Sequence, residues 1–206
     1  MKKILKKNKV NGIINGMKPL TITEFGNPVL YKKAKDVSLK TLKTPAFKKL
    51  VKDMFFTMNK AAGVGLAAPQ IDKSIKLALV GITSNNPRYK SAKKEDFQAI
   101  IINPKIIEYS KAKNFDWEGC LSLPGISGKV WRSNKIRVLY WDENGTKHIH
   151  DYEGFTARVF QHEIDHLYGI LFVDRMTDMK TLTPNTERAR QNSPKAKRSA
   201  SKKNRK

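Results

Sequence analysis

A five-residue motif, HEIDH at residues 162–166, combines side chains and spacing that suit metal-dependent hydrolysis. Positions four apart share one face of a helix, so the imidazoles of His162 and His166 can reach one metal ion. Glu163, one residue along, can then reach a water molecule bound to that ion. The alternative is a partly exposed helix whose histidines only pack or form hydrogen bonds. Because the motif uses two of the four histidines in the chain, we interpret it as a metal site.

A catalytic zinc-type site has three protein ligands and one open position, so this motif needs a third donor. The candidates are Cys120, His148, His150 and the surrounding carboxylates. Cys120 lies in WEGCLSLPG, where glycine and proline predict irregular backbone, and a thiolate is a strong ligand for such metals. A lone cysteine is also commonly a small buried apolar residue. His148 and His150 share one face of a predicted strand, and their simplest interpretation is exposed hairpin histidines.

The segment GVGLAAPQ at residues 63–70 is a second candidate part of a site. Gly63 and Gly65 permit a close approach of backbone, and Gln70 offers an amide donor for a developing oxyanion. A Gly-Ala-rich turn used only for packing is the alternative. The segment lacks the lysine of a phosphate-binding loop, so we expect no nucleotide cofactor.

Two helices are predicted to support these segments. Residues 45–62 place apolar side chains on one helical face, with Thr44 as N-cap, Pro45 in the first turn and Gly63 after the end. A second helix, from about Gly154 to Leu167 with Gly169 as a stop signal, carries the HEIDH motif. Its apolar face is continuous with its histidine face, so the metal ligands should lie in the wall of the core.

Strands are predicted from three apolar, β-branched runs, at residues 75–83, 99–110 and 135–142. A turn at Asn144-Gly145 joins the last run to KHIHDYE, which indicates a β-hairpin. The polar segment 85–98 between the first two runs should be a surface loop.

Length and composition favour one globular domain, with 206 residues of which 39% are hydrophobic. A single cysteine excludes an intramolecular disulfide and indicates a reducing compartment or a metal-binding thiolate. No run approaches the roughly 18 apolar residues of a membrane span, and the basic N-terminus lacks a following apolar signal segment. We therefore expect a cytoplasmic protein with no membrane partner; an organellar matrix is the alternative.

The formal net charge of +23 is concentrated at the two ends of the chain. Residues 1–17 form a basic extension, and Met17 is an alternative start. Residues 179–206 form a basic tail with almost no large apolar side chain, which predicts disorder. Such ends are typical of contacts with polyanions, so we expect the tail to bind the ribosome or RNA. A tail that only increases solubility is the alternative.

GVGLAAPQ, EGCLS and QHEIDH, in that order, resemble the three signature motifs of the peptide deformylase family. The resemblance implies a catalytic domain over residues 18–178. It implies an α+β fold in which antiparallel or mixed β-sheets pack around a central helix with the HExxH motif, plus an N-terminal amphipathic helix. The implied activity is metal-dependent removal of the formyl group from the N-terminal formylmethionine of nascent polypeptides, with release of formate.

The same resemblance implies roles for individual residues. The metal ligands are Cys120, His162 and His166, and they hold one divalent ion, expected to be Fe(II), with nickel, cobalt or zinc as possible replacements. Glu163 is the general base. Gln70 and the backbone amide of Leu121 donate hydrogen bonds to the formyl oxygen.

The substrate, a formylmethionyl nascent peptide, needs an apolar slot for its methionine. Gly65 is expected along the path of the substrate backbone. By position, the wall residues are Val64, Leu123, Phe155 and Val159. The stem of Arg158 should flank the slot while its guanidinium reaches water. Arg132 either pairs with Glu118 or lends positive charge to the mouth of the pocket.

Two other functions stay open. One is a general metalloprotease of the HExxH class, although no third ligand is evident downstream of the helix. The other is an RNA- or ribosome-binding protein with a structural or vestigial metal site, against which the retention of Gln70, Cys120 and Glu163 argues.

Overall fold

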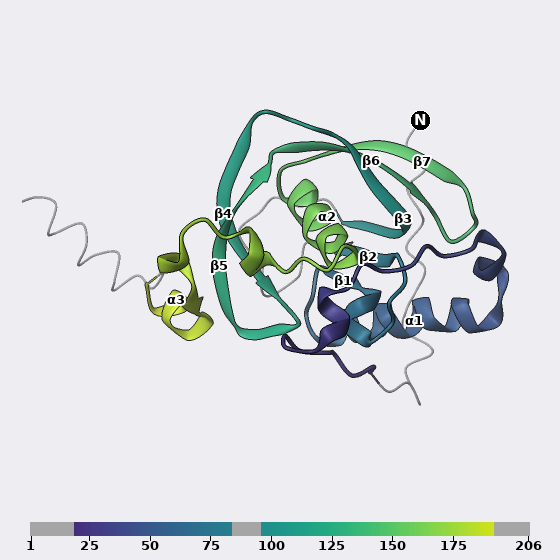
Figure 1. Ribbon diagram of the computed structural model, residues 1–206, viewed down its shortest axis with the longest axis horizontal. Helices are drawn as coiled ribbons and strands as arrows, with labels where there is room; N and C mark the ends of the chain where they lie inside the picture. The colour runs from purple at the N-terminus through teal and green to yellow at the C-terminus, as the bar shows by residue number, and fades with distance from the viewer. Residues whose placement is uncertain (1–18, 84–95, 192–206) are drawn as a thin grey trace, which may run out of the picture.

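The computed structural model describes residues 19–83 and 96–191. Two antiparallel sheets lie on either side of a central helix, α2 (Gly154–Leu167), as Figure 1 shows, and this confirms the expected α+β fold class. One sheet has the strand order β1-β2-β3-β6-β7 and the other the order β4-β5-β8. The strands are β1 (Gly65–Ala67), β2 (Leu77–Ile82), β3 (Phe97–Tyr109), β4 (Lys113–Cys120), β5 (Leu123–Ser133), β6 (Lys135–Trp141), β7 (Lys147–Glu153) and β8 (Thr183–Pro184).

The amphipathic helix expected at residues 45–62 is confirmed as α1 (Pro45–Lys60). Thr44 caps it, because its hydroxyl accepts a hydrogen bond from the Phe47 amide at 3.2 Å. Its apolar face, which includes the fully buried Met54, packs against residues of β1 and β2. Burial of one such side chain contributes about 1.5–3 kcal/mol, so the helix is held mainly by this face. Short 3-10 helices are Pro28–Tyr31, Leu39–Lys43, Ala68–Ile71, Phe172–Arg175 and Met179–Thr181.

The predicted strands and hairpin are confirmed as β2, β3 and the β6–β7 pair, in which Val138 lies opposite His150. Most of the polar segment 85–98, which we expected to be a surface loop, lies outside the described residues. His148 hydrogen-bonds Asp142 at 3.0 Å, and its ring stacks on that of His150 with centroids 5.5 Å apart. Both histidines therefore belong to the hairpin and take no part in the metal-ligand cluster.

The backbone around Cys120 is irregular, as expected. β4 and β5 form a hairpin joined by the two-residue turn Leu121–Ser122, and their register shifts between Gly119 and Cys120. Gly125, in β5, has a φ of +78°. Cys120 lies at the last position of β4, opposite Leu123. The pairs from Lys113 to Gly119 are in regular register, so the thiol lies at the end of a continuous ladder.

The prediction of disorder from residue 179 onward is wrong for residues 179–191. Thr183 of β8 pairs with Ser127 of β5, and helix α3 (Asn185–Gln191) follows directly. Leu182, just before β8, packs against the core cluster that contains Cys120. A few backbone hydrogen bonds and one apolar anchor therefore order a segment whose composition alone predicts disorder. The rest of the tail and the basic extension lie outside the described residues.

Helix α2 occupies the predicted residues, and every side chain from Ala157 to Leu167 is buried. Apolar clusters from both sheets pack around it. None of the helices in the described ranges is both long and apolar enough to span a bilayer. The HEIDH motif is thus held on a helix that is enclosed on all sides.

Candidate metal centre and active site

Three potential metal ligands converge between the end of β4 and helix α2. The ligand atoms of Cys120, His162 and His166 all lie within 4.8 Å of one another. The thiol sulfur of Cys120 is 3.2 Å from Nε2 of His166. The structure therefore brings together the three residues that the resemblance implied, from segments more than forty residues apart.

The chemistry of this donor set fits a divalent metal. Burial alone would raise the pKa of the Cys120 thiol, but the imidazoles of His166 and His162 hold it well below its usual range. Nδ1 of His162 is 2.9 Å from Oε2 of Glu118, which leaves Nε2 as the ring nitrogen available to an ion. In the described part of the chain, Oε2 of Glu163 is a buried oxygen without a hydrogen-bond partner, beside these ligands. A thiolate, two imidazoles and an unsatisfied carboxylate form a typical catalytic metal site.

The carboxylate of Glu163 lies against the backbone of β1. A Cβ atom added to Gly65 would be 2.2 Å from Oε1 of Glu163, so only glycine permits this approach. Glu163 is 4% exposed. Burial raises its pKa to about 7, although the imidazoles of His162 and His166 lower it. A carboxyl group with a pKa near neutrality can both accept and return a proton.

The side-chain amide of Gln70 is held with its nitrogen toward the ligands. Its oxygen accepts a hydrogen bond from the Ala67 amide at 2.8 Å. Its nitrogen is 3.3 Å from the sulfur of Cys120 and 3.2 Å from the hydroxyl of Ser122. Because the oxygen is already engaged, the donor end of the amide points into the site.

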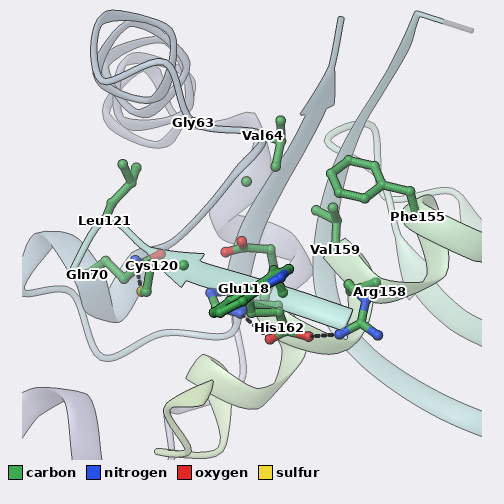
Figure 2. Close-up of a pocket in the computed structure, with 14 residues that line it drawn as sticks. Gly63, Val64, Gln70, Glu118, Cys120, Leu121, Phe155, Arg158, Val159 and His162 are labelled. Atoms are coloured by element: carbon green, nitrogen blue, oxygen red, sulfur yellow. Dashed lines mark hydrogen bonds and ion pairs between the residues drawn. The ribbon is translucent and has the colours of Figure 1, made fainter. Parts of the chain in front are cut away.

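A pocket opens beside the ligands, and Figure 2 shows Phe155 and Val159 of α2 across it from Gln70 and Leu121. Among the residues expected around the substrate, Val64, Gly65, Phe155 and Val159 line this pocket. Leu123 does not line it, because its side chain points into the core cluster with Leu30 and Phe172. Trp117 and Gly119 also line the pocket. Neither is predicted from the sequence, because the glycine-containing segment around them does not show the pattern of a strand.

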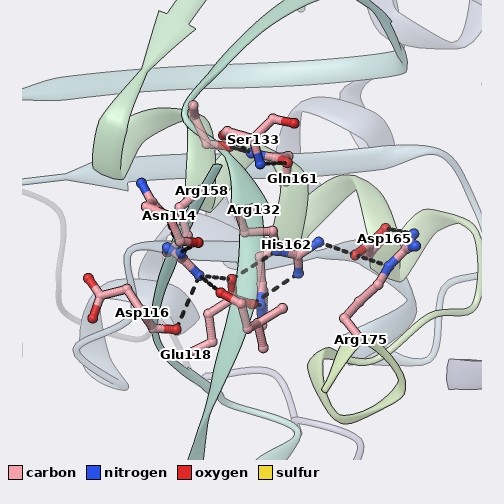
Figure 3. Close-up of polar contacts among 12 residues, drawn as sticks. Asn114, Asp116, Glu118, Arg132, Ser133, Arg158, Gln161, His162, Asp165 and Arg175 are labelled. Atoms are coloured by element: carbon pink, nitrogen blue, oxygen red, sulfur yellow. Dashed lines mark hydrogen bonds and ion pairs between the residues drawn. The ribbon is translucent and has the colours of Figure 1, made fainter. Parts of the chain in front are cut away.

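Behind the ligands, Glu118 is surrounded by cations (Figure 3). Arg132 donates two hydrogen bonds to its carboxylate, at 2.9 and 3.0 Å, and Arg158 donates one at 2.7 Å. Burial alone would raise the pKa of Glu118, but the hydrogen bonds from His162 and Arg132 hold it well below its usual range. An ionised Glu118 fixes the orientation of the His162 ring.

The expectation for Arg158 is wrong in one respect, because its guanidinium does not reach water. The residue is 4% exposed and also donates to the Val130 carbonyl and to Asn114. Arg132 does not line the pocket; besides Glu118 it contacts Asp165, at 2.5 Å. The buried carboxylate of Glu118 explains both placements, since removing a charge from water requires close partners of opposite charge.

Comparisons with known proteins agree on one family. The sequence model of polypeptide deformylase matches residues 19–182. Peptide deformylase of Leptospira biflexa serovar Patoc is 48% identical over 159 residues, which cover 77% of this chain and 88% of that protein. Peptide deformylase 2 of Nostoc sp. is 42% identical over 165 residues, 80% of this chain and 90% of that protein.

Solved structures give the same result. The Met-Ala-Ser-bound class I type b peptide deformylase from Acinetobacter baumannii superposes with a TM-score of 0.74 at 36% identity, covering 78% of this chain and 99% of that one. Peptide deformylase from Thermotoga maritima superposes with a TM-score of 0.68 at 37% identity, with the same coverage.

Proposed function

The chain belongs to the peptide deformylase family, and from this premise we propose which of its residues carry out the reaction. The protein is a metal-dependent hydrolase that removes the formyl group from the N-terminal formylmethionine of nascent polypeptides. The observation that supports our assignment of the site is the cluster of Cys120, His162 and His166 beside the buried Glu163.

The pocket receives the formylmethionine end of the peptide. Its methionine side chain packs against Val64, Phe155 and Val159, and the formyl group lies toward Glu163. Among the described strands, β4 and β1 each lie at an edge of their sheet, and both border the pocket. The peptide can therefore leave the pocket as an extended segment along a sheet edge.

Cys120, His162 and His166 hold the metal ion. When bound, a divalent ion would act as a Lewis acid that activates a water molecule and polarises the formyl group. We propose Fe(II), with nickel, cobalt or zinc as replacements, on the strength of the family resemblance and a donor set that suits all four. Metal analysis of protein purified without oxygen tests this: iron should predominate, and zinc in its place would contradict the assignment.

Glu163 moves the proton. Its carboxylate accepts a proton from the attacking water and delivers it to the nitrogen of the departing amine as the carbon–nitrogen bond breaks, which yields formate and a free amino terminus. Gln70, through its side-chain amide, and Leu121, through its backbone amide, donate hydrogen bonds to the formyl oxygen as negative charge develops. Their enclosure in the pocket strengthens these interactions.

The test uses metal-loaded protein with formyl-Met-Ala-Ser and with the same peptide lacking the formyl group. Formate should appear only with the first. Glu163→Gln should lower kcat by about 100-fold or more, because general acid–base catalysis contributes that much, while the bound metal is retained. Glu153→Gln, an exposed glutamate before the same helix, is the matched control.

Two outcomes would contradict the assignment. Cleavage of internal peptide bonds would indicate a general metalloprotease. Turnover of neither peptide, together with salt-sensitive RNA binding, would indicate a binding protein with a vestigial metal site.

We also propose that the basic residues 192–206 bind the ribosome, where nascent chains emerge, and that the protein acts in the cytoplasm. The support is the concentration of Lys and Arg in this segment. Deleting residues 192–206 should leave small-peptide turnover intact and weaken ribosome association, with the largest difference at low salt. Unchanged association would exclude the tail as the contact.

A further inference from the structure

We propose that Arg188, on helix α3, is a specificity-determining residue that favours acidic side chains directly after the formylmethionine. The inference rests on the proposed function, since it concerns the peptide that this pocket binds. It assigns a role in substrate choice to a C-terminal segment that lies beyond the three sequence motifs.

The first observation is the position of Trp117. This residue lies three positions before Cys120 on β4 and lines the pocket. Side chains alternate along β4, so the indole ring lies on the face of the hairpin opposite Glu118. A peptide that leaves along this edge strand alternates in the same way: when the methionine side chain enters the pocket, the side chain of the next residue is on the face of the ring.

The second observation is that Arg188 contacts the pocket-lining Trp117 and also Ser127, a residue next to the pocket. Its guanidinium carbon is 4.6 Å from the centroid of the Trp117 ring. Its Nη1 is 3.5 Å from the hydroxyl of Ser127, which pairs across the hairpin with the pocket-lining Gly119. The pairing of β8 with β5 brings α3 to this place. A guanidinium stacked on an indole is held in one orientation, so it can bind a substrate group with little further loss of entropy.

The charges around Trp117 favour an anionic substrate. The ammonium group of Lys129 lies 5.5 Å from the same ring. The carboxylate of α3, Glu187, pairs with Arg190. Asp116, the acidic neighbour of Trp117 in the sequence, belongs to the opposite face of β4, because side chains alternate along a strand. Inside the pocket, Glu118 is paired with Arg132 and Arg158. Two cations therefore face the path of the peptide.

The experiment compares two amidated peptides, formyl-Met-Asp-Asp and formyl-Met-Asn-Asn, which have similar shapes and differ in charge. Wild-type turnover of either peptide establishes the activity itself. The wild type should prefer the acidic peptide, and Arg188→Ala should reduce the ratio of kcat/KM values by about threefold to fivefold, through KM, as expected for one partly exposed charge pair. The preference should weaken as salt is added.

Three variants separate a charge contact from a structural role. Lys147→Ala, which removes an exposed cation from β7 in the other sheet, should keep the wild-type ratio. Arg188→Lys should keep part of the preference, because the charge remains while the stacking is lost. Arg188→Glu should favour formyl-Met-Lys-Lys over the acidic peptide. If Arg188→Ala lowers kcat/KM equally for all peptides, or changes kcat alone, the proposal is overturned, even when the wild-type enzyme is active.

Discussion

The position of the Glu163 carboxylate depends on the missing side chain of Gly65. Strand β1 packs so closely against this carboxylate that a single added carbon would overlap three of its atoms, at 2.2 to 2.7 Å. Glu163 is almost fully buried and lines the pocket, so a displaced carboxylate would leave its position beside the metal ligands. A backbone position on one element thus determines where a proton acceptor lies on another.

Gly65→Ala should therefore lower kcat far more than it lowers stability. The methyl group displaces the Glu163 carboxylate, so we expect kcat to fall by about 100-fold, comparable to the loss of a general base. Steady-state kinetics with formyl-Met-Ala-Ser, together with thermal unfolding, measure both effects.

Gly81→Ala on β2 is the matched control. A Cβ atom there would be 2.4 Å from the terminal methyl of Met58, which belongs to the core on the side of α1. This variant should lose stability and keep its kcat. If Gly65→Ala instead keeps wild-type kcat, the close approach of β1 does not determine the position of the Glu163 carboxylate.

Residue spacing alone predicted part of this site. The HEIDH spacing placed His162, Glu163 and His166 together because a helix has a fixed period, and the structure shows them so. It could not choose the third ligand, since Cys120 reaches the helix only through the sheet. Arg158 was misjudged for a related reason: its partner Glu118 lies on a strand that the sequence did not predict.

At the level of elements, helix α2 is followed, two residues after its end, by a backbone position that only glycine can occupy. Gly169 has φ of +73°, and a Cβ atom there would be 2.6 Å from the backbone carbon of Tyr31. The sequence predicted this stop signal correctly. The sequence could not show that Gly169 also packs against the backbone of Tyr31 in the N-terminal segment.

Gly169→Ala should lower the free energy of unfolding by at least about 2 kcal/mol, from the left-handed conformation and the overlap with Tyr31. This corresponds to a decrease in Tm of roughly 4–8 °C for a chain of this size. Gly145→Ala is the control: its φ is +80°, yet a Cβ atom would meet only Leu42, at 3.8 Å. The loss of unfolding free energy in Gly169→Ala should exceed that in Gly145→Ala by the cost of the overlap with Tyr31. Equal losses would show that the backbone relieves this overlap without cost.

The hairpin β4–β5 is the element that sequence patterns missed. Its apolar and polar side chains do alternate in part, but glycines at positions 119, 125 and 128 obscure the pattern. One face carries Trp117 and Trp131, and the other carries Glu118 and Arg132. A charged pair on the buried face is the reverse of the usual strand pattern, and only the metal site explains it.

At the scale of the whole molecule, the metal ligands join two separate layers. Cys120 belongs to the sheet β4-β5-β8, whereas His162 and His166 belong to α2, which packs against the larger sheet as well. A bound ion therefore adds a link between elements that apolar contacts and buried ion pairs, such as Glu118–Arg158, already hold together. Metal binding should contribute to global stability as well as to catalysis.

Removing the metal with a chelator should lower Tm by roughly 5–10 °C, because a ligand present at 100 times its Kd stabilises the folded state by about 2.7 kcal/mol. Adding Fe(II) or nickel back should restore it. Glu163→Gln should show the same dependence, since that residue is not a ligand. Identical melting curves with and without metal would contradict a connecting role.

Cys120 is both the single thiol of the chain and a proposed metal ligand, so its reactivity can measure which fraction of the molecules holds a metal ion. It is the only thiol among 206 residues, so an alkylating reagent can mark each chain once at most. A thiolate bound to a metal ion reacts slowly with the alkylating reagent, whereas a metal-free thiolate reacts quickly. The mass spectrum of a briefly alkylated sample would then show two peaks, one for unmodified and one for alkylated protein. The ratio of their intensities gives the ratio of metal-loaded to metal-free enzyme.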